Sequence, residues 1–193
     1  MSDERVMPGT TEIYNVNKHI ARYNMAMQRC QGKDVLDVAS GAGYGTNMLS
    51  WVARHVLGVE KDIGAWQYSQ LEFHRYNVDF HCEDLTTFID PEGFDVIVSF
   101  ETAEHIENLD DWRAMVKRNL RPGGHLIYSV PLNEVPGFNE HHYHSFDLES
   151  AKQLYPHGRL VGSAIQKGVN MMDESEYEAD EQFTYFLGVV HNG

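Results

Sequence analysis

The sequence is poor in cysteine and contains no long apolar run. Its two cysteines, Cys30 and Cys82, show no C-x-x-C spacing, so they fit a reducing compartment and provide no zinc site. No segment approaches the roughly 18 consecutive apolar residues of a membrane-spanning helix, and residues 1–9 lack the apolar core of a signal peptide. We therefore expect a soluble, cytoplasmic protein without a membrane partner.

Basic residues are also scarce. The 193 residues include 15 Lys and Arg against 29 Asp and Glu, which gives a formal net charge of −14. Such a surface repels phosphodiester backbones and anionic membranes, so no nucleic-acid partner is expected. With 42% hydrophobic residues and no repeat or linker, residues 1–193 are expected to form a single domain with a substantial core. The oligomeric state, including a homodimer, stays open.

Strand and helix patterns alternate along the chain, which favours a parallel sheet covered by helices on both faces. Strands are expected at 34–39, 55–61, 78–82, 94–100 and 124–130, followed by a closing hairpin at 159–169 and 182–191. Helices are expected at 11–29 and 44–53, then after Asp62 and after Asp110, each of which can cap its helix, and from about Asp147. Residues 1–30 are interpreted as a helical flap outside the sheet, 131–146 as a substrate-side loop, and 173–180 as a solvated acidic connection.

The most informative stretch runs from Asp34 to Gly45. An apolar strand that carries Asp37 ends in a loop with glycines at every second position, Gly41, Gly43 and Gly45. Glycine adopts unusual backbone angles and lets a ligand lie against the main chain. The helix that follows offers free N–H groups at its start. The arrangement suits a nucleoside cofactor at the C-terminal edge of a parallel sheet.

A dinucleotide is not the expected ligand of this loop. The dinucleotide fingerprint is G-x-G-x-x-G, whereas the spacing here is G-x-G-x-G and Thr46 stands where the third glycine would fall. Asp37 would also place a carboxylate near the phosphates of a dinucleotide. A carboxylate is favourable instead if the ligand carries an ammonium and a sulfonium group.

These residues resemble the first motif of the class I S-adenosylmethionine (SAM)-dependent methyltransferases, roughly (D/E)xGxGxG, with Ala39 in place of the usual first glycine. Further motifs follow in the family's order over most of 34–131: Gly58 to Asp62, Glu83 to Leu85, the EHI sequence that ends at Ile106, and the RPGG turn that ends at Gly124. The resemblance implies a doubly wound, Rossmann-like α/β fold. Its seven-stranded sheet would be mostly parallel, with a C-terminal antiparallel hairpin and helices on both faces.

The resemblance also implies SAM as cofactor and S-adenosyl-L-homocysteine (SAH) as product. Glu60, at a strand end, would accept hydrogen bonds from the ribose hydroxyls. Asp84 would accept one from the adenine amine. Arg22 would either hold the carboxylate of the cofactor's methionine part or only dock the leading helix on the sheet. The expected cofactor-binding residues are Arg22, Asp37, Ala39, Ser40, Gly41, Gly43, Glu60, Lys61, Asp84, Leu85, Phe100 and Glu101.

Three histidines are the expected catalytic residues. Methyl transfer depends on alignment of nucleophile, carbon and sulfur, and an oxygen acceptor with a high pKa also needs a base. His105 follows the 94–100 strand, and His142 and His144 lie in the 131–146 loop beside the same sheet edge. Two alternatives stay open: His105 only packs or caps a helix, or a zinc ion binds to His141, His142, His144 and Asp147. Because no second set of ligands is evident, no metal is expected.

Motifs for nucleic-acid acceptors are missing. The chain lacks the Asn/Asp-Pro-Pro-Tyr/Phe motif of base-modifying amino-methyltransferases and the Pro-Cys nucleophile of cytosine-C5 enzymes. Together with the net charge, these absences favour a small-molecule or sugar-like acceptor, methylated at oxygen or nitrogen. Three other interpretations stay open, namely aminopropyl transfer, a non-catalytic SAM-binding protein and a nicotinamide oxidoreductase.

Overall fold

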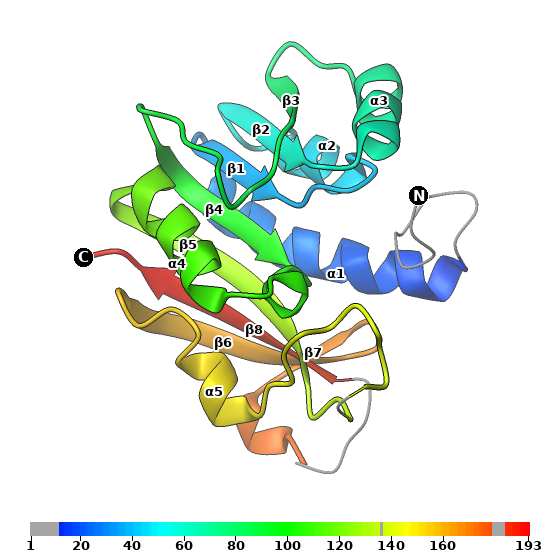
Figure 1. Ribbon diagram of the computed structural model, residues 1–193, viewed down its shortest axis with the longest axis vertical. Coiled ribbons are helices and arrows are strands. Elements are labelled where there is room, and N and C mark those ends of the chain that lie inside the picture. Colours follow the sequence, from blue (N-terminus) through cyan, green and yellow to red (C-terminus); the bar gives the residue numbers. More distant parts are fainter. Residues whose placement is uncertain (1–11, 136, 179–183) are drawn as a thin grey trace.

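The computed structural model describes residues 12–135, 137–178 and 184–193, which form an eight-stranded sheet (Figure 1). The strand order is β3-β2-β1-β4-β5-β8-β6-β7. The parallel strands are β1 (Asp34–Val38), β2 (His55–Glu60), β3 (Val78–Cys82), β4 (Phe94–Phe100) and β5 (Leu120–Leu132). The antiparallel strands are β6 (Arg159–Lys167), β7 (Asn170–Met172) and β8 (Thr184–His191).

This topology confirms the expected α/β fold with a mostly parallel sheet and a C-terminal antiparallel hairpin. The sheet has one strand more than the seven expected. Gly168, with a φ of +62°, turns the chain back, so that the short β7 pairs with the end of β6. Residues 182 and 183 of the expected hairpin, and 179 and 180 of the acidic connection, lie outside the described residues.

The strand order reverses between β1 and β4. From β1 the chain builds outward to β3 at one edge and then returns to place β4 on the other side of β1. The carboxyl ends of β1, β2 and β4 therefore open onto one crevice, which is where open α/β sheets bind their ligands.

Helices cover both faces of the sheet. α1 (Ile13–Cys30) and α2 (Tyr44–Leu49) pack on one face, and α4 (Leu109–Asn119) and α5 (Leu148–Lys152) pack on the other, as Figure 1 shows for α1 and α4. α3 (Ile63–Glu72) lies beside β3, and two 3₁₀ turns are η1 (Ala103–His105) and η2 (Glu174–Glu176). α1 lies outside the sheet as expected, but Tyr23, Ala26 and Cys30 are buried against it, so α1 is a packed layer rather than a detached flap. No described helix is long and apolar enough to cross a membrane.

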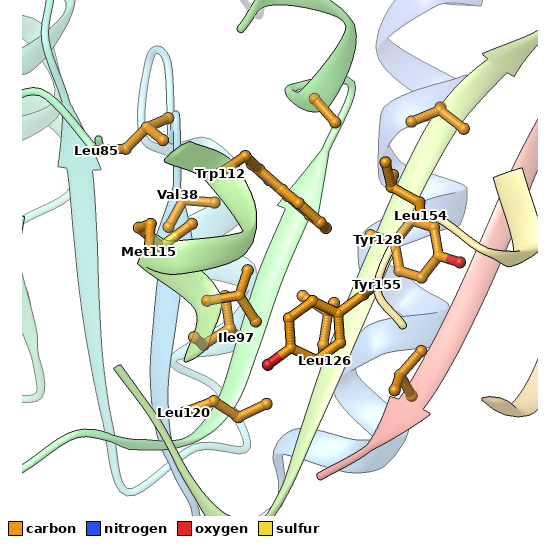
Figure 2. Close-up of a cluster of buried hydrophobic side chains, with 14 of the residues drawn as sticks. Val38, Leu85, Ile97, Trp112, Met115, Leu120, Leu126, Tyr128, Leu154 and Tyr155 are labelled. Atoms are coloured by element: carbon orange, nitrogen blue, oxygen red, sulfur yellow. The ribbon is translucent and has the colours of Figure 1, made fainter. Parts of the chain in front are cut away.

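The core has two halves because successive strand residues face opposite sides of the sheet. In β4, Val96 and Val98 pack under α1, whereas Ile97 packs under α4. Figure 2 shows the half of the core that lies under α4, with Trp112 of α4 directed toward Tyr128 of β5. The indole is fully buried and its Nε1 donates a hydrogen bond to Ser99 Oγ at 3.0 Å.

The ends of some helices and strands agree with the sequence predictions, and others differ. Asp62 caps α3 as predicted, and Asp147, where a helix was expected to begin, caps α5; each accepts a backbone N–H three residues on. Asn108, not Asp110, caps α4, since its side chain accepts from the Asp110 N–H at 3.2 Å. β5 begins at Leu120 rather than at Gly124, because Leu120 pairs with Phe94 before the register shifts at the RPGG segment. α2 ends at Leu49 instead of residue 53.

Gly45 allows α1 and α2 to approach closely, which gives a first test. A Cβ at Gly45 would lie 1.9 Å from Tyr23 Cζ, and the Tyr23 ring packs edge-on against Phe100. We predict that Gly45→Ala lowers the free energy of unfolding by about 1–3 kcal/mol, measured by urea denaturation. Gly162→Ala is the control, because its Cβ would meet only Val189 Cβ at 3.9 Å, and we expect a change below about 1 kcal/mol. Equal effects of the two substitutions would contradict this packing.

Candidate functional site

A cavity of about 1330 Å³ opens where the strand order reverses. Its wall is formed by α1, by the segments that follow β1, β2, β3 and β4, and by the 131–146 loop. The predicted site residues that line it are Ala39, Ser40, Gly41, Glu60, Lys61, Asp84, Leu85, Phe100, Glu101, His105 and His142. Four others, Arg22, Asp37, Gly43 and His144, lie outside the lining. The roles assigned to all of these residues stay predictions.

The loop after β1 owes its shape to left-handed backbone angles. Ala39, Gly41 and Gly43 have φ values of +53°, +56° and +85°. A Cβ at Gly43 would lie 2.5 Å from Ser69 Cβ, so only glycine fits there. Alanine is small, so its replacement of glycine at Ala39 was expected to be a mild change, yet the left-handed backbone angle costs an L-residue about 1–2 kcal/mol. The departure from the family motif therefore matters through backbone strain rather than size.

Glu60 holds this loop against β2. Its Oε2 accepts a hydrogen bond from the Gly41 N–H at 2.9 Å, and its Oε1 accepts one from the Asp62 N–H at 2.8 Å. The carboxylate thus joins the loop after β1 to the start of α3 at the cavity wall. A ligand that rests on the Gly41 backbone would meet the Glu60 carboxylate beside it.

Asp84 lies one strand further along the same wall. Thr86 donates to Asp84 Oδ1 from its side chain at 2.7 Å and from its backbone N–H at 2.8 Å. The hydrogen bond from the Thr86 side chain has the largest effect on the pKa of Asp84, followed by that from the Thr86 N–H. Both lower this pKa, so the carboxylate is ionised. Leu85 beside it is buried. Asp84 and Leu85 therefore pair a charged acceptor with an apolar surface.

Asp37 lies behind the cavity wall. It accepts a hydrogen bond from Thr46 Oγ1 at 2.7 Å, and the single Tyr23 hydroxyl proton is shared between its two oxygens at 3.2 and 3.3 Å. Burial raises the pKa of Asp37 to about 7, although the hydrogen bonds from Thr46 and Tyr23 oppose the shift. Asp37 and Thr46 are the two departures from the dinucleotide fingerprint. They are linked, because Thr46, which stands in the place of the third glycine, donates a hydrogen bond to Asp37.

Glu101 and Arg22 form an ion pair between β4 and α1. Arg22 Nη1 lies 3.4 Å from Glu101 Oε1, and the guanidinium stacks on the Tyr185 ring at 4.8 Å from its centroid. Ser129 Oγ donates to Glu101 at 2.6 Å, and Glu101 has a φ of +49°. Among the described residues, Arg22 Nε and Nη1 have no hydrogen-bond partner. The contacts of Arg22 dock α1, and its buried nitrogens retain the capacity to bind an anion.

At the other end of the cavity, Glu104, His105 and His142 form what we call the Glu104 cluster. One ligand atom of each residue lies within 4.8 Å of those of the other two, and the imidazole centroids are 4.6 Å apart. Glu104 is fully buried, and burial, followed by the effect of Glu101, raises its pKa well above the ordinary value. Neither carboxylate oxygen of Glu104 has a hydrogen-bond partner among the described residues.

The 131–146 loop is held against η1 by several hydrogen bonds. His105 Nδ1 lies 3.1 Å from the His141 carbonyl oxygen, and the Tyr143 N–H donates to the Glu104 carbonyl oxygen at 2.8 Å. His144 Nε2 lies 2.9 Å from the Ile106 carbonyl oxygen, so His144 does not join His105 and His142. The alternative set of His141, His142, His144 and Asp147 does not converge either, because Asp147 caps α5.

Sequence reasoning missed several polar residues around the site. Glu134 binds His142 Nδ1 through its carboxylate, Ser129 binds Glu101, and the Tyr185 ring lies under Arg22. Glu134 and Tyr185 also line the cavity. A usable signal existed for Glu134, since it follows the end of β5, at the edge where the ligands of parallel sheets bind. Tyr185 belongs to the antiparallel β8, and its position depends on tertiary pairing.

Comparisons with known proteins show which family and fold this chain resembles. Residues 36–128 match the family model described as a methyltransferase domain. A probable S-adenosylmethionine-dependent methyltransferase of Mycolicibacterium smegmatis is 32% identical over 133 residues, covering 68% of this chain and 51% of that protein. A ubiquinone biosynthesis O-methyltransferase of Chelativorans sp. is 26% identical over 126 residues, covering 63% and 49%. The chain thus spans about half the length of these curated relatives.

A solved structure shares the fold across almost the whole chain. It is the N-methyltransferase NodS from Bradyrhizobium japonicum WM9 in complex with S-adenosyl-L-homocysteine. The TM-score is 0.74 at 17% identity, and the match covers 99% of this chain and 93% of that chain.

The buried Asp37 predicts a pH dependence of stability. With a pKa raised to about 7, the folded state retains a proton that the unfolded state loses near pH ~4, so the contribution of Asp37 is lost as pH rises through about 7. We predict that wild-type stability relative to Asp37→Asn falls between about pH 5 and about pH 8 in urea denaturation.

Asp34→Asn is the matched control for this measurement. Its hydrogen bond with Arg54 lowers the pKa of Asp34, so the difference from wild type should stay constant over that pH range. A pH-independent difference for Asp37→Asn as well would contradict the effect of burial on Asp37.

Proposed function

Since this chain belongs to the class I SAM-dependent methyltransferase family, we propose that it transfers the methyl group of SAM to a small-molecule or sugar-like acceptor, at oxygen or nitrogen, and releases SAH. The observation that carries this proposal is the shared cavity wall of Gly41, Glu60 and Asp84, at the point where the strand order reverses. A dinucleotide has no comparable support, because the loop lacks the G-x-G-x-x-G spacing.

The order of the lining segments supports an elongated nucleoside ligand. Asp84 and Leu85 follow β3, Glu60 ends β2, and the glycine loop follows β1, so the three positions form a row toward the centre of the sheet. In our assignment adenine lies at Asp84 and Leu85 and the ribose hydroxyls bind Glu60. The methionine part then reaches the glycine loop. In this assignment Asp37 and Arg22, which lie outside the cavity lining, act on its ammonium and carboxylate groups from behind the wall.

The sulfonium methyl group then points to the end of the cavity that holds the Glu104 cluster. The acceptor oxygen or nitrogen forms a bond to the methyl carbon while the carbon–sulfur bond breaks, and the electron pair of that bond remains on sulfur. SAM thereby becomes the neutral thioether SAH, and the acceptor proton leaves at the Glu104 cluster. Alignment of the two ligands supplies much of the rate enhancement in such a displacement.

The residues around the Glu104 cluster suit a polar acceptor of small size. The acids Glu107, Asp111 and Glu134 line this end of the cavity, together with the aromatic rings of Phe138 and Tyr143. The 131–146 loop supplies several of these side chains, which supports its assignment as the substrate-side loop. The acidic lining disfavours a phosphate-rich acceptor. The matched relatives are named for methylation at oxygen and at nitrogen, so both atoms belong to the proposal.

The cofactor assignment is tested by Glu60→Gln. The substitution removes a charged acceptor for the ribose hydroxyls, and we predict SAM affinity about 10- to 100-fold lower by calorimetric titration. Glu72→Gln, on an exposed position of α3, is the control and should bind SAM as the wild type does. Unchanged affinity of Glu60→Gln would contradict the assigned ribose site.

The reaction itself is tested by product analysis. Wild-type protein with SAM is screened against small hydroxyl and amine acceptors, sugars included, and SAH is quantified. SAH that appears only with an acceptor supports methyl transfer. SAM uptake with another nucleoside product would favour aminopropyl transfer, and tight NAD(P) binding without SAM uptake would contradict the proposal.

A further inference from the structure

The Glu104 cluster combines two imidazole rings with one carboxylate around a single point. One ligand atom each from Glu104, His105 and His142 lies within 4.8 Å of the other two. Imidazole nitrogens with a carboxylate oxygen form a donor set typical of divalent first-row transition metals, whereas Mg²⁺ prefers oxygen ligands alone. The cluster lines the cavity, so a cation there would face whatever ligand the cavity holds.

Glu104 needs a partner that the described residues do not provide. The side chain is 0% exposed, and both of its oxygens lack a hydrogen-bond partner among the described residues. A buried polar group without a partner is costly, and buried charges are normally paired or bound to a metal ion. A cation that Glu104 shares with the two histidines would supply a partner for its carboxylate.

Both histidine rings are oriented in the manner of metal ligands. The partners of their Nδ1 atoms are the His141 carbonyl oxygen for His105 and the Glu134 carboxylate for His142. These oxygens only accept hydrogen bonds, so each Nδ1 carries the proton and each Nε2 has the lone pair that binds a metal. Metal-ligating histidines commonly donate their other N–H to a carboxylate or a backbone carbonyl. Asn139 Nδ2 lies 2.9 Å from His142 Nε2, so a cation would replace that contact.

The charges around the cluster also favour a cation. Glu101 and Glu134 are the acids that interact with Glu104, and Arg22 is the base. Arg22 is paired with Glu101 at 3.4 Å, so its charge is already partly balanced. The Glu134 carboxylate therefore remains beside the cluster without a balancing charge from Arg22.

We infer that Glu104, His105 and His142 bind one divalent transition-metal cation of the Mn²⁺, Co²⁺ or Zn²⁺ class at the acceptor end of the cavity. No metal was expected from the sequence. Glu104 and His105 belong to the EHI sequence and His142 belongs to the 131–146 loop, so only the fold brings the three residues together. The use of the cation rests on the proposed function: a cation held by these three residues would lower the pKa of a bound acceptor hydroxyl, so that its proton could leave at this end of the cavity without transfer to a histidine.

Manganese titration of the whole chain tests the site. After chelator treatment, free Mn²⁺ is followed by electron paramagnetic resonance, and we expect one ion bound per chain. Glu104→Gln and His142→Gln should each weaken Mn²⁺ binding at least about tenfold. His141→Gln is the matched control, because this histidine lies in the same loop with an exposed ring, and it should bind Mn²⁺ as the wild type does. Wild-type binding no tighter than that of Glu104→Gln would overturn the inference.

Two further measurements keep the result decisive. The Co²⁺ absorption spectrum of the wild type reports nitrogen ligands, and a spectrum without them would overturn the site even if a variant failed to fold. SAM titration of the same samples separates the two proposals. SAM uptake without Mn²⁺ binding would overturn the metal site alone, whereas Mn²⁺ binding without SAM uptake would overturn the proposed function and leave the metal site standing.

Discussion

The buried carboxylate of Asp37 is the point at which β1, α1 and α2 are joined. Thr46 of α2 and Tyr23 of α1 both donate hydrogen bonds to it, and the Tyr23 ring occupies space that exists only because Gly45 has no Cβ. These contacts fix the start of α2, and with it the left-handed loop from Ala39 to Gly43. The cavity wall therefore depends on a carboxylate that lies behind it.

The acids of the cavity divide into two groups with different chemistry. Glu60 and Asp84 accept hydrogen bonds from nearby N–H and O–H groups, so their oxygens are arranged for neutral donors such as those of a nucleoside. Glu104 is buried without such donors among the described residues and lies beside two histidines. One end of the cavity thus suits recognition by hydrogen bonds, and the other suits a cation and the activation of an acceptor.

Much of the fold could be predicted because its signals are local. The apolar run of β4 had the observed bounds, and the cap at Asp62 follows from a side chain that binds its own helix. Tertiary contacts decided the rest. β7 forms because it pairs with the end of β6. His144 binds the Ile106 carbonyl oxygen, after η1. The 131–146 loop packs over Glu104, where the Tyr143 N–H donates to the Glu104 carbonyl oxygen. The cavity residues were found from strand ends, whereas Tyr185 and the pairing of His105 with His142 required the folded chain.

The most direct test of the account is a crystal structure of the protein with SAH. We predict one SAH per chain across the strand-order reversal, with adenine against Leu85, its amine at Asp84 and the ribose hydroxyls on Glu60. The sulfur would then face the end of the cavity formed by Glu104, His105 and His142. SAH bound elsewhere, or bound with its ribose away from Glu60, would contradict the central claim.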